Sequence, residues 1–424
     1  MSEPGQKPAP LKRTVGLFGA TVLGLGSIVG TGVFVSIAFA INVAGEWTPL
    51  AVLLAGLLAL CNGLSSAQLA AAHPVSGGSY EYGYRYLNPA LGFTAGWMFL
   101  VAKGASAATA AYGFAIYLSR LVPLLAETNP RIPALVSVVV LTGIVLSGLK
   151  RSARANAILV AVSVTALAVF VGYGLTIEVN AAPAKEPFEA MSFLHATALL
   201  FVAFTGYGRV ATMGEEIRDP AKNIPIAVAM TVGASALIYG AVALVLVRVS
   251  PGQDSEVAPL IDAVASSPAW LTTFIIVGAI TAMLGVLMNL LLGLSRVVLA
   301  MARRGDLPSA LSVIAESGES PNRAVLLVAV GISTLILVAG HPKMAWSLSA
   351  LTVLIYYATA NLCALQQPTE ERRVPRIVSV AGLGGCASLV VFFPHSFLGL
   401  AVGLIVTGLI WHFVAQRLAA RHQW

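Results

Sequence analysis

Four glycines interrupt the first long hydrophobic segment of the chain, at positions 24, 26, 30 and 32. Each glycine in a helix interior costs about 1 kcal/mol relative to alanine, so this density predicts that the backbone leaves the helical conformation there. Irregular backbone at membrane depth is stable only where it is buried in protein or lines a polar cavity, because lipid offers no hydrogen bonds. We therefore expect other parts of the chain to enclose this segment.

The composition indicates a polytopic membrane protein. Of the 424 residues, 58% are hydrophobic and 10% are charged, whereas a soluble domain carries roughly 25% charged residues. A hydrocarbon core of about 30 Å requires roughly 20 apolar residues per helix, and twelve segments meet this requirement. They are residues 14–40, 49–72, 87–121, 131–149, 156–177, 192–216, 225–249, 270–302, 322–340, 344–365, 375–393 and 395–416.

The distribution of basic residues favours twelve crossings with both termini in the cytoplasm. With this topology, 18 of the 25 lysines and arginines lie in cytoplasmic segments and five lie outside, in agreement with the positive-inside rule. The other two, Lys103 and Arg209, fall within spans. Because the basic residues occupy short loops and not one folded face, the net charge of +7 does not indicate nucleic-acid binding.

A second glycine interruption occurs in the sixth span, where Gly206 and Gly208 flank Tyr207. Span 1 opens one set of five spans and span 6 opens the next, which predicts a 5+5 inverted repeat. Paired interruptions of this kind are typical of the binding sites of secondary transporters. We expect a disordered cytoplasmic tail at residues 1–10, a transporter core at 11–366 with repeats at 11–178 and 190–366, and helices 11 and 12 with a cytoplasmic C-terminus at 367–424.

Motifs along the chain resemble those of the amino acid–polyamine–organocation (APC) superfamily of permeases. The segment Gly26–Phe34 resembles G-x-x-I-G-[ST]-G-I-F, and His73–Tyr80 resembles P-x-S-G-G-x-Y. Gly206–Tyr207 with Glu215–Pro225 resembles G-F…E-E-x-x-N-P-x-x-x-I-P, and Ser295–Pro308 resembles S-R…A-R-x-G-x-L-P. Each motif is weak alone, but together they stand in order at the corresponding spans.

The resemblance covers essentially all of spans 1–10. It implies an all-α integral membrane protein with a LeuT-like (APC) fold, in which helices 1 and 6 are broken at mid-membrane. It also implies alternating access to a substrate held between these two breaks, without covalent catalysis. The substrate itself is not named by the resemblance.

The interrupted part of span 1 is a candidate carboxylate site. Backbone N–H groups freed at the end of a half-helix attract anions, and two hydroxyl side chains lie within the segment. The resemblance implies that this segment binds the α-carboxylate of the substrate. The alternative is that its glycines serve tight helix packing. The residues concerned are Ser27, Ile28, Val29, Gly30, Thr31 and Gly32.

The interrupted part of span 6 is expected to bind an α-ammonium. Carbonyl groups freed around Phe204, Thr205 and Gly206 suit a cation, and the resemblance implies that an aromatic side chain here, with Tyr207 as its counterpart, closes over the substrate. The alternative for the rings is packing in the core or against lipid. Many relatives carry an acidic residue after this aromatic, whereas this chain has Gly208, which argues against strongly cationic substrates.

Lys103 lies 16 residues into span 3, roughly 24 Å along a helix that rises 1.5 Å per residue. An ionisable side chain at this depth is costly and is by default a functional candidate. Span 3 resembles that of the bacterial arginine/agmatine antiporter, which places Lys103, next to Ala102, at the substrate pocket. A lysine removed from water releases its proton more readily and can exchange it. Lys103 is therefore a candidate substrate-anion or coupling group, or else a structural cation bonded to carbonyls of a broken helix.

Candidate coupling and gating residues lie on spans 5, 6 and 8. Some relatives carry a lysine where this chain has Ser163, which together with Thr281 and span-1 carbonyls could coordinate sodium, although such hydroxyls often bond to their own helix. Asn289 could bond across to span 3 or serve as helix glue. Arg209 is favoured for a gating or structural role over substrate contact.

Glu215 and Glu216 lie at the cytoplasmic end of span 6, either in a gating salt-bridge cluster or in a solvated loop. The three cysteines all fall within spans and show neither disulfide nor metal-ligand spacing, so we expect no metal and no cofactor. A membrane enzyme would require clustered catalytic groups, and a channel would require a repeated filter or a ring of charge. Neither pattern is present in the sequence.

The sequence therefore predicts a multi-pass transporter of the cytoplasmic membrane that is not an enzyme. Its expected substrate is a small neutral or anionic amino acid, with a proton, or less favourably sodium, as the coupling ion. The alternative is transport of a polyamine, another amine or an inorganic ion on the same fold.

Overall fold

The computed structural model describes residue 13 and residues 15–74, 77–147, 152–177, 187–212, 217–249, 258–314 and 321–420. Over these residues the chain is helical, apart from turns, short loops and one isolated bridge between Val15 and Ile217. The tail predicted at residues 1–10 lies outside the described residues, as do Val75 and Ser76 of the second motif and both glutamates, Glu215 and Glu216.

The helices of the first half alternate between long apolar elements and short connecting ones. Their bounds are α1 Leu17–Ile28, α2 Ile37–Ala44, α3 Thr48–Ala72, α4 Ser79–Tyr86, α5 Pro89–Leu121, α6 Arg131–Leu146 and α7 Ser152–Gly174. Those of the second half are α8 Ala190–Phe204, α9 Gly208–Thr212, α10 Pro220–Val249, α11 Pro259–Ala263, α12 Ala269–Arg304, α13 Asn322–Ala339, α14 Pro342–Gln366, α15 Arg376–Val390 and α16 His395–Ala420.

Nine helical stretches among the described residues are long and apolar enough to cross a membrane. The first of them, Leu17–Ala72, contains α1 to α3 and has 56 residues, about twice the length that one crossing needs. The apolar helices α6 and α15 are shorter, with 16 and 15 residues. The chain is therefore a multi-pass membrane protein, and the predicted number of twelve crossings stays a prediction.

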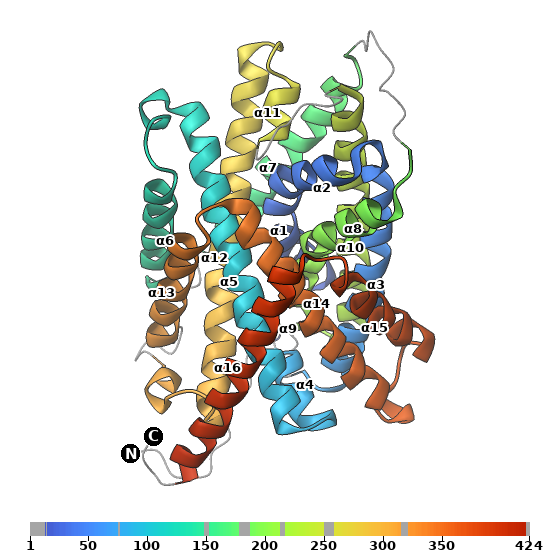
Figure 1. Ribbon diagram of the computed structural model, residues 1–424, viewed down its shortest axis with the longest axis vertical. Coiled ribbons are helices and arrows are strands. Elements are labelled where there is room, and N and C mark those ends of the chain that lie inside the picture. Colours follow the sequence, from blue (N-terminus) through green and yellow to red (C-terminus); the bar gives the residue numbers. More distant parts are fainter. Residues whose placement is uncertain are drawn as a thin grey trace.

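The most enclosed helices are those that surround the interrupted segments. In α5, most of the middle of the helix is buried and consists of alanine, glycine, serine and threonine, which allows neighbouring helices to approach closely. This helix packs against α12 and α14. At opposite edges of the bundle, α6 lies beside α13 and α15 lies beside α3, with α1 near the middle (Figure 1).

The apolar faces that point away from the bundle are those expected of a lipid-exposed surface. In α6, Ile132, Val136, Val139 and Val140 are each more than half exposed, whereas Ala134 on the other face is buried. A contiguous exposed apolar surface of this kind is unusual for a soluble monomer. It fits the membrane environment that the composition predicts.

Regular α-helix gives way to other backbone geometry at both glycine interruptions. Helix α1 ends at Ile28, Gly32–Ser36 form a π-helical turn, and α2 follows. Helix α8 ends at Phe204, and Thr205–Tyr207 form one 3₁₀ turn before α9. The two irregular segments lie against each other, since a Cβ atom on Gly206 would lie 2.2 Å from the Ser27 carbonyl oxygen.

A buried carboxylate fastens α16 to the end of α12. Gly305 ends α12 in the left-handed conformation (φ 86°), which glycine adopts without strain. Asp306 follows, is fully buried, and accepts hydrogen bonds from the hydroxyls of Tyr80 (2.6 Å) and Tyr84 (2.5 Å) on α4. Its other carboxylate oxygen lies 2.9 Å from Nδ1 of His412 on α16. This cluster joins three helices that are far apart in the sequence.

Candidate functional site

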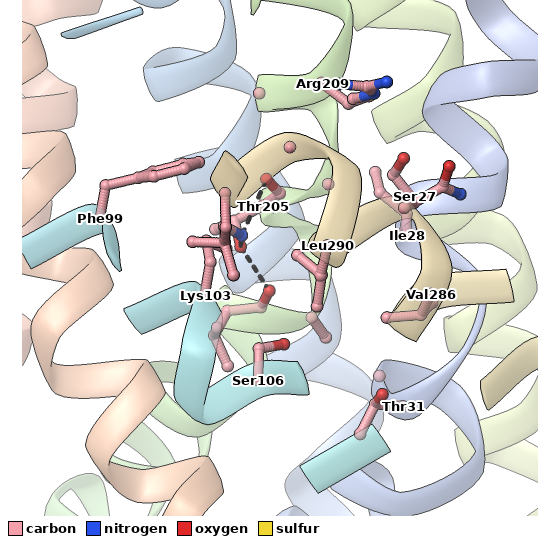
Figure 2. Close-up of a pocket in the computed structure, with 18 of the residues that line it drawn as sticks. Ser27, Ile28, Thr31, Phe99, Lys103, Ser106, Thr205, Arg209, Val286 and Leu290 are labelled. Atoms are coloured by element: carbon pink, nitrogen blue, oxygen red, sulfur yellow. Dashed lines mark hydrogen bonds between the residues drawn. The ribbon is translucent and has the colours of Figure 1, made fainter. Parts of the chain in front are cut away.

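A cavity of about 700 Å³, open space at its mouth included, lies beside the two interrupted segments. Helices α1, α5, α8, α9, α12 and α14 and the two irregular segments contribute to its wall. Figure 2 shows Lys103 and Phe99 on one side of this space and Ser27, Ile28 and Val286 on the other. The lining residues are Ser27, Ile28, Thr31, Gly32, Phe99, Lys103, Ser106, Val202, Ala203, Thr205, Gly206, Gly208, Arg209, Val286, Asn289, Leu290, Gly293, Leu294 and Trp346.

The span-1 segment contributes four of its six predicted residues to the cavity wall. These are Ser27, Ile28, Thr31 and Gly32. Val29 does not line the cavity, and neither does Gly30, where an added Cβ atom would lie 2.4 Å from Cγ2 of Val286. Gly30 therefore fits the alternative in which the glycines allow tight helix packing, because α12 approaches this backbone too closely for a larger side chain.

Thr31 carries a hydroxyl group that is unpaired within the described part of the chain. The residue is only 2% exposed, and its Oγ1 has no hydrogen-bond partner there. A buried hydroxyl without a partner is destabilising by roughly 1–3 kcal/mol. By contrast, Oγ of Ser27 donates to the Leu23 carbonyl oxygen at 3.0 Å within its own helix. Thr31 thus presents an unused donor and acceptor at the cavity wall.

Lys103 on α5 reaches across to the interrupted part of span 6. Its side chain is 6% exposed, and Nζ donates to Oγ1 of Thr205 at 2.6 Å and to the Thr205 carbonyl oxygen at 3.2 Å (Figure 2). The neighbouring Ala102 is buried and does not line the cavity. These contacts fit the second alternative for Lys103, a structural cation bonded to a carbonyl of an interrupted helix.

The Thr205 carbonyl oxygen has three donors around it. Besides Lys103, it accepts hydrogen bonds from the backbone N–H of Gly208 and from the hydroxyl of Tyr357 at 3.2 Å. A carbonyl oxygen has two lone pairs, so its accepting capacity is already taken up. The carbonyl that was expected to receive a substrate ammonium is therefore occupied by groups of the protein itself.

The two predicted aromatic residues lie in the core and not on the cavity wall. Phe204 packs against the ring of Tyr239, with centroids 5.1 Å apart, and Tyr207 packs against Tyr357 at 5.3 Å. Both side chains are fully buried. The aromatic residues that do line the cavity are Phe99 and Trp346.

Arg209 is the second basic residue at the cavity, and Figure 2 places it at the opposite end from Thr31. A Cβ atom on Gly293 would lie 3.9 Å from Nη1 of Arg209, so the guanidinium lies beside α12 at ordinary contact distance. None of the described residues that line the cavity is aspartate or glutamate. The cavity wall therefore combines two basic side chains with neutral polar and apolar groups.

Asn289 lines the cavity and joins α12 to two other helices. Its Nδ2 donates to Oδ1 of Asn156 on α7 at 2.8 Å and to the Gly26 carbonyl oxygen on α1 at 3.3 Å. Of the two alternatives for Asn289, these bonds within the described part of the chain fit the one in which it joins helices, since they run to α7 and α1 and not to span 3. The reason is the rotation of α12, which turns Asn289 toward α7 and α1.

Ser163 and Thr281 meet between α7 and α12, away from the cavity. Their hydroxyl oxygens are 3.3 Å apart, and both donate to backbone carbonyls, Ser163 to Leu159 at 2.7 Å and Thr281 to Val277 at 2.9 Å. Both hydroxyls also contact the Gly278 carbonyl oxygen. Bonds to a residue's own helix are the common alternative to ion coordination. Among the described residues there is also no cluster of three His, Cys, Asp or Glu that could hold a metal.

Several lining residues were missed, although a helical signal for them was present. Phe99 and Ser106 lie four residues before and three after Lys103, and therefore share one face of α5. Val286 and Gly293 lie three residues before and four after Asn289 on α12, and Leu290 lies four residues after Val286. Extending each candidate along its own helix face would have found them. Val202 and Trp346 had no such signal.

Comparisons with known proteins match nearly the whole chain. The sequence profile of the amino acid permease family matches residues 19–417. An uncharacterized transporter of Mycobacterium tuberculosis is 37% identical over 419 residues, which cover 96% of this chain and 91% of the relative. The branched-chain amino acid permease BcaP of Bacillus subtilis is 29% identical over 73% of this chain and 71% of its own length. The methylthioribose transporter of Bacillus subtilis is 29% identical over 82% of this chain and 81% of its own length.

The family match and the M. tuberculosis relative both extend over more than nine-tenths of the chain. They agree with the helical architecture and with the motifs at the two interruptions and at the end of α12. The chain belongs to the amino acid permease family of the APC superfamily.

Proposed function

We propose that the chain is a secondary active transporter that moves a small neutral or anionic amino acid by alternating access. The substrate binds in the cavity beside the interrupted segments of spans 1 and 6. In this proposal the chain crosses the cell membrane twelve times as a 5+5 inverted repeat with two added helices, and both termini lie in the cytoplasm.

The observation that carries this proposal is the chemistry of the cavity wall. Lys103 supplies positive charge, Thr31 supplies a hydroxyl without a partner among the described residues, and the described lining residues include no carboxylate. A ligand with a carboxylate group balances this wall, whereas a ligand with a net positive charge is repelled by it.

The rest of the wall favours an aliphatic side chain on the substrate. Phe99, Val202, Val286, Leu290 and Trp346 supply apolar surface around the polar groups. Burial of apolar surface contributes roughly 25 cal/mol per Å², so such a wall selects for branched or unbranched hydrocarbon groups over polar ones. The branched-chain amino acid permease among the relatives supports this choice.

Coupling to a proton is the part of the proposal that involves Lys103. The ammonium lies in a largely apolar wall and is bonded to Thr205 alone among the described side chains. Loss of its proton would weaken these bonds, and a ligand carboxylate nearby would favour the protonated form. Sodium is the less favoured coupling ion in this proposal, since Ser163 and Thr281 lie outside the cavity wall.

A screen of the purified protein tests the proposal. Each of the twenty amino acids is tested for thermal stabilisation at about pH 5.5 and pH 7.5, with and without sodium, because a ligand stabilises by RT ln(1 + [L]/Kd). Stabilisation by aliphatic amino acids, followed by their uptake into proteoliposomes, supports the proposal. If no amino acid stabilises the protein and methylthioribose, an amine or an inorganic ion does, the amino acid assignment is wrong.

A further inference from the structure

The two acceptors of Thr205, on the irregular segment of span 6, are used within the protein. The Thr205 carbonyl oxygen receives Lys103 Nζ, the Tyr357 hydroxyl and the Gly208 N–H. Oγ1 of Thr205 accepts from Lys103 at 2.6 Å and donates to the Val202 carbonyl oxygen at 2.7 Å. An ammonium group of a ligand would have to displace Lys103 to bind here.

The neighbouring backbone acceptors are engaged as well. The Ile28 carbonyl oxygen accepts from the Tyr239 hydroxyl at 2.6 Å, and the Gly26 carbonyl oxygen accepts from Asn289. The polar side chains that remain at the wall are the hydroxyls of Ser27, Thr31 and Ser106 and the Asn289 amide. These groups are neutral. Ser27 and Asn289 already donate to other groups of the protein, so the Thr31 hydroxyl, which has no partner among the described residues, is the clearest donor for a carboxylate.

The balance of charge leads to the same conclusion independently. The ammonium of Lys103, with no acidic side chain among the described lining residues, makes this part of the wall complementary to a negative group of a ligand. A zwitterion brings its own positive charge into this space, whereas a monocarboxylate does not. A carboxylate near Lys103 would gain a charge-assisted contact, and an amino group would gain none.

We propose that the ammonium of Lys103 takes the place of the substrate's α-ammonium in the cavity. The site then binds its ligand through the carboxylate and the apolar side chain alone. Aliphatic monocarboxylates without an amino group, such as the 2-oxo, 2-hydroxy and unsubstituted acids, are then ligands of the same cavity. This inference rests on the proposed function, and it extends the substrate class from amino acids to the corresponding carboxylic acids.

Three probes of the same carbon skeleton test the proposal on the wild-type protein. They are L-valine, 3-methylbutanoate, which lacks the amino group, and 2-methylpropylamine, which lacks the carboxylate; calorimetry gives the Kd of each. We expect 3-methylbutanoate to bind within about tenfold of valine or more tightly, and the amine not to bind. If the amino group makes a charge-assisted hydrogen bond, its loss weakens binding about 10- to 150-fold, and that result would overturn the proposal.

Two charge-neutralising variants separate the role of Lys103 from a general effect of charge. Lys103→Met leaves the Thr205 hydroxyl open to a ligand ammonium, so the preference should move toward valine by at least about tenfold. Arg120→Gln removes one positive charge outside the cavity, so the ratio of the two Kd values should stay within about threefold of that of the wild type. An unchanged ratio in Lys103→Met contradicts the proposal.

The design also distinguishes this inference from the proposed function. If valine binds and 3-methylbutanoate does not, the result agrees with the proposed amino acid transport and contradicts only the role proposed for Lys103. If neither probe binds, the three-ligand comparison is repeated with the amino acid that stabilises the protein in the screen, its analogue without the amino group and its analogue without the carboxylate. If no amino acid stabilises the protein, both the proposed function and the role of Lys103 are refuted. The wild-type comparison decides the question even where Lys103→Met does not fold.

Discussion

Gly206 and Ser27 are in direct backbone contact, although 179 positions separate them in the sequence. A Cβ atom on Gly206 would lie 2.2 Å from the Ser27 carbonyl oxygen and 2.4 Å from its carbonyl carbon. No side chain fits at this distance, so only glycine allows the two irregular segments to meet. Because both residues line the cavity, this contact fixes the relative position of its two walls.

The variant Gly206→Ala tests the importance of this contact. The added methyl group forces the segments apart, and we expect a loss of stability of roughly 1–3 kcal/mol, as for other overpacked sites, together with loss of ligand binding. Thermal unfolding and proteoliposome uptake measure the two effects. Gly233→Ala is the matched control, because its Cβ atom meets nothing within 4 Å; equal loss in both variants would show that the close approach is unimportant.

The unpaired hydroxyl of Thr31 leads to a prediction in which stability and binding move apart. Thr31→Val removes a buried hydroxyl that has no partner among the described residues, so we expect unchanged or slightly raised thermal stability. Binding of the amino acid found in the screen should weaken about 2- to 12-fold, the loss of one hydrogen bond. Thr31→Ser keeps the hydroxyl and should bind as the wild type does. Equal affinity of the valine and threonine forms would exclude contact between this hydroxyl and the ligand.

Asp306 is expected to be among the most sensitive positions outside the cavity. Asp306→Ala leaves the hydroxyls of Tyr80 and Tyr84 and the His412 ring without their shared acceptor. Removing one member of a buried charged cluster costs about 3–5 kcal/mol, so the midpoint of thermal unfolding should fall sharply. Asp262→Ala is a useful contrast, because its carboxylate lies 3.9 Å from Arg120 and is partly exposed; it should cost less than about 1 kcal/mol. Similar losses would argue against a special role of the buried cluster.

Glu371 gives a pH-dependent prediction at the loop between α14 and α15. The Tyr86 hydroxyl, 2.6 Å from its carboxylate, lowers the pKa of Glu371 from the ordinary value of 4.5, with a smaller contribution from His73. A carboxylate whose pKa is lowered by folding stabilises the folded state above its ordinary pKa and loses this effect as the pH falls through the folded value. The difference in unfolding midpoint between the wild type and Tyr86→Phe should therefore be present at pH 7 and shrink below about pH 4.5. A difference that does not change with pH would assign the effect to packing of the ring.

Much of the helical architecture could be predicted from the sequence because its signals are local. The predicted span 87–121 corresponds to α5 at Pro89–Leu121, and the predicted span 322–340 to α13 at Asn322–Ala339. Both interruptions lie where the glycines stand, since the backbone preference of glycine acts within a few residues. Boundaries set by loops were less accurate: α10 begins at Pro220 and not near 225, because Pro225 is accommodated inside the helix.

The contacts across the cavity could not be predicted in the same way, because they depend on how each helix is rotated about its axis. Asn289 bonds to Asn156 and Gly26 and not to span 3, and Tyr207 packs against Tyr357 and not over the cavity. Such rotations are set by packing against residues more than a hundred positions away. Periodicity along one helix does not contain this information.

The sequence by itself determined that the chain is helical and membrane-embedded, that two glycine-rich segments interrupt its helices, and that a lysine lies deep within the third span. Only the tertiary structure decided what that lysine does. The packing of α5 against the irregular part of span 6 places Nζ of Lys103 at Thr205. Lys103 thus occupies the hydroxyl and carbonyl oxygens of Thr205, which are unoccupied when the span-6 segment is considered by itself. Hydrogen-bonding capacity belongs to single residues, but its use depends on which distant groups the fold brings within reach.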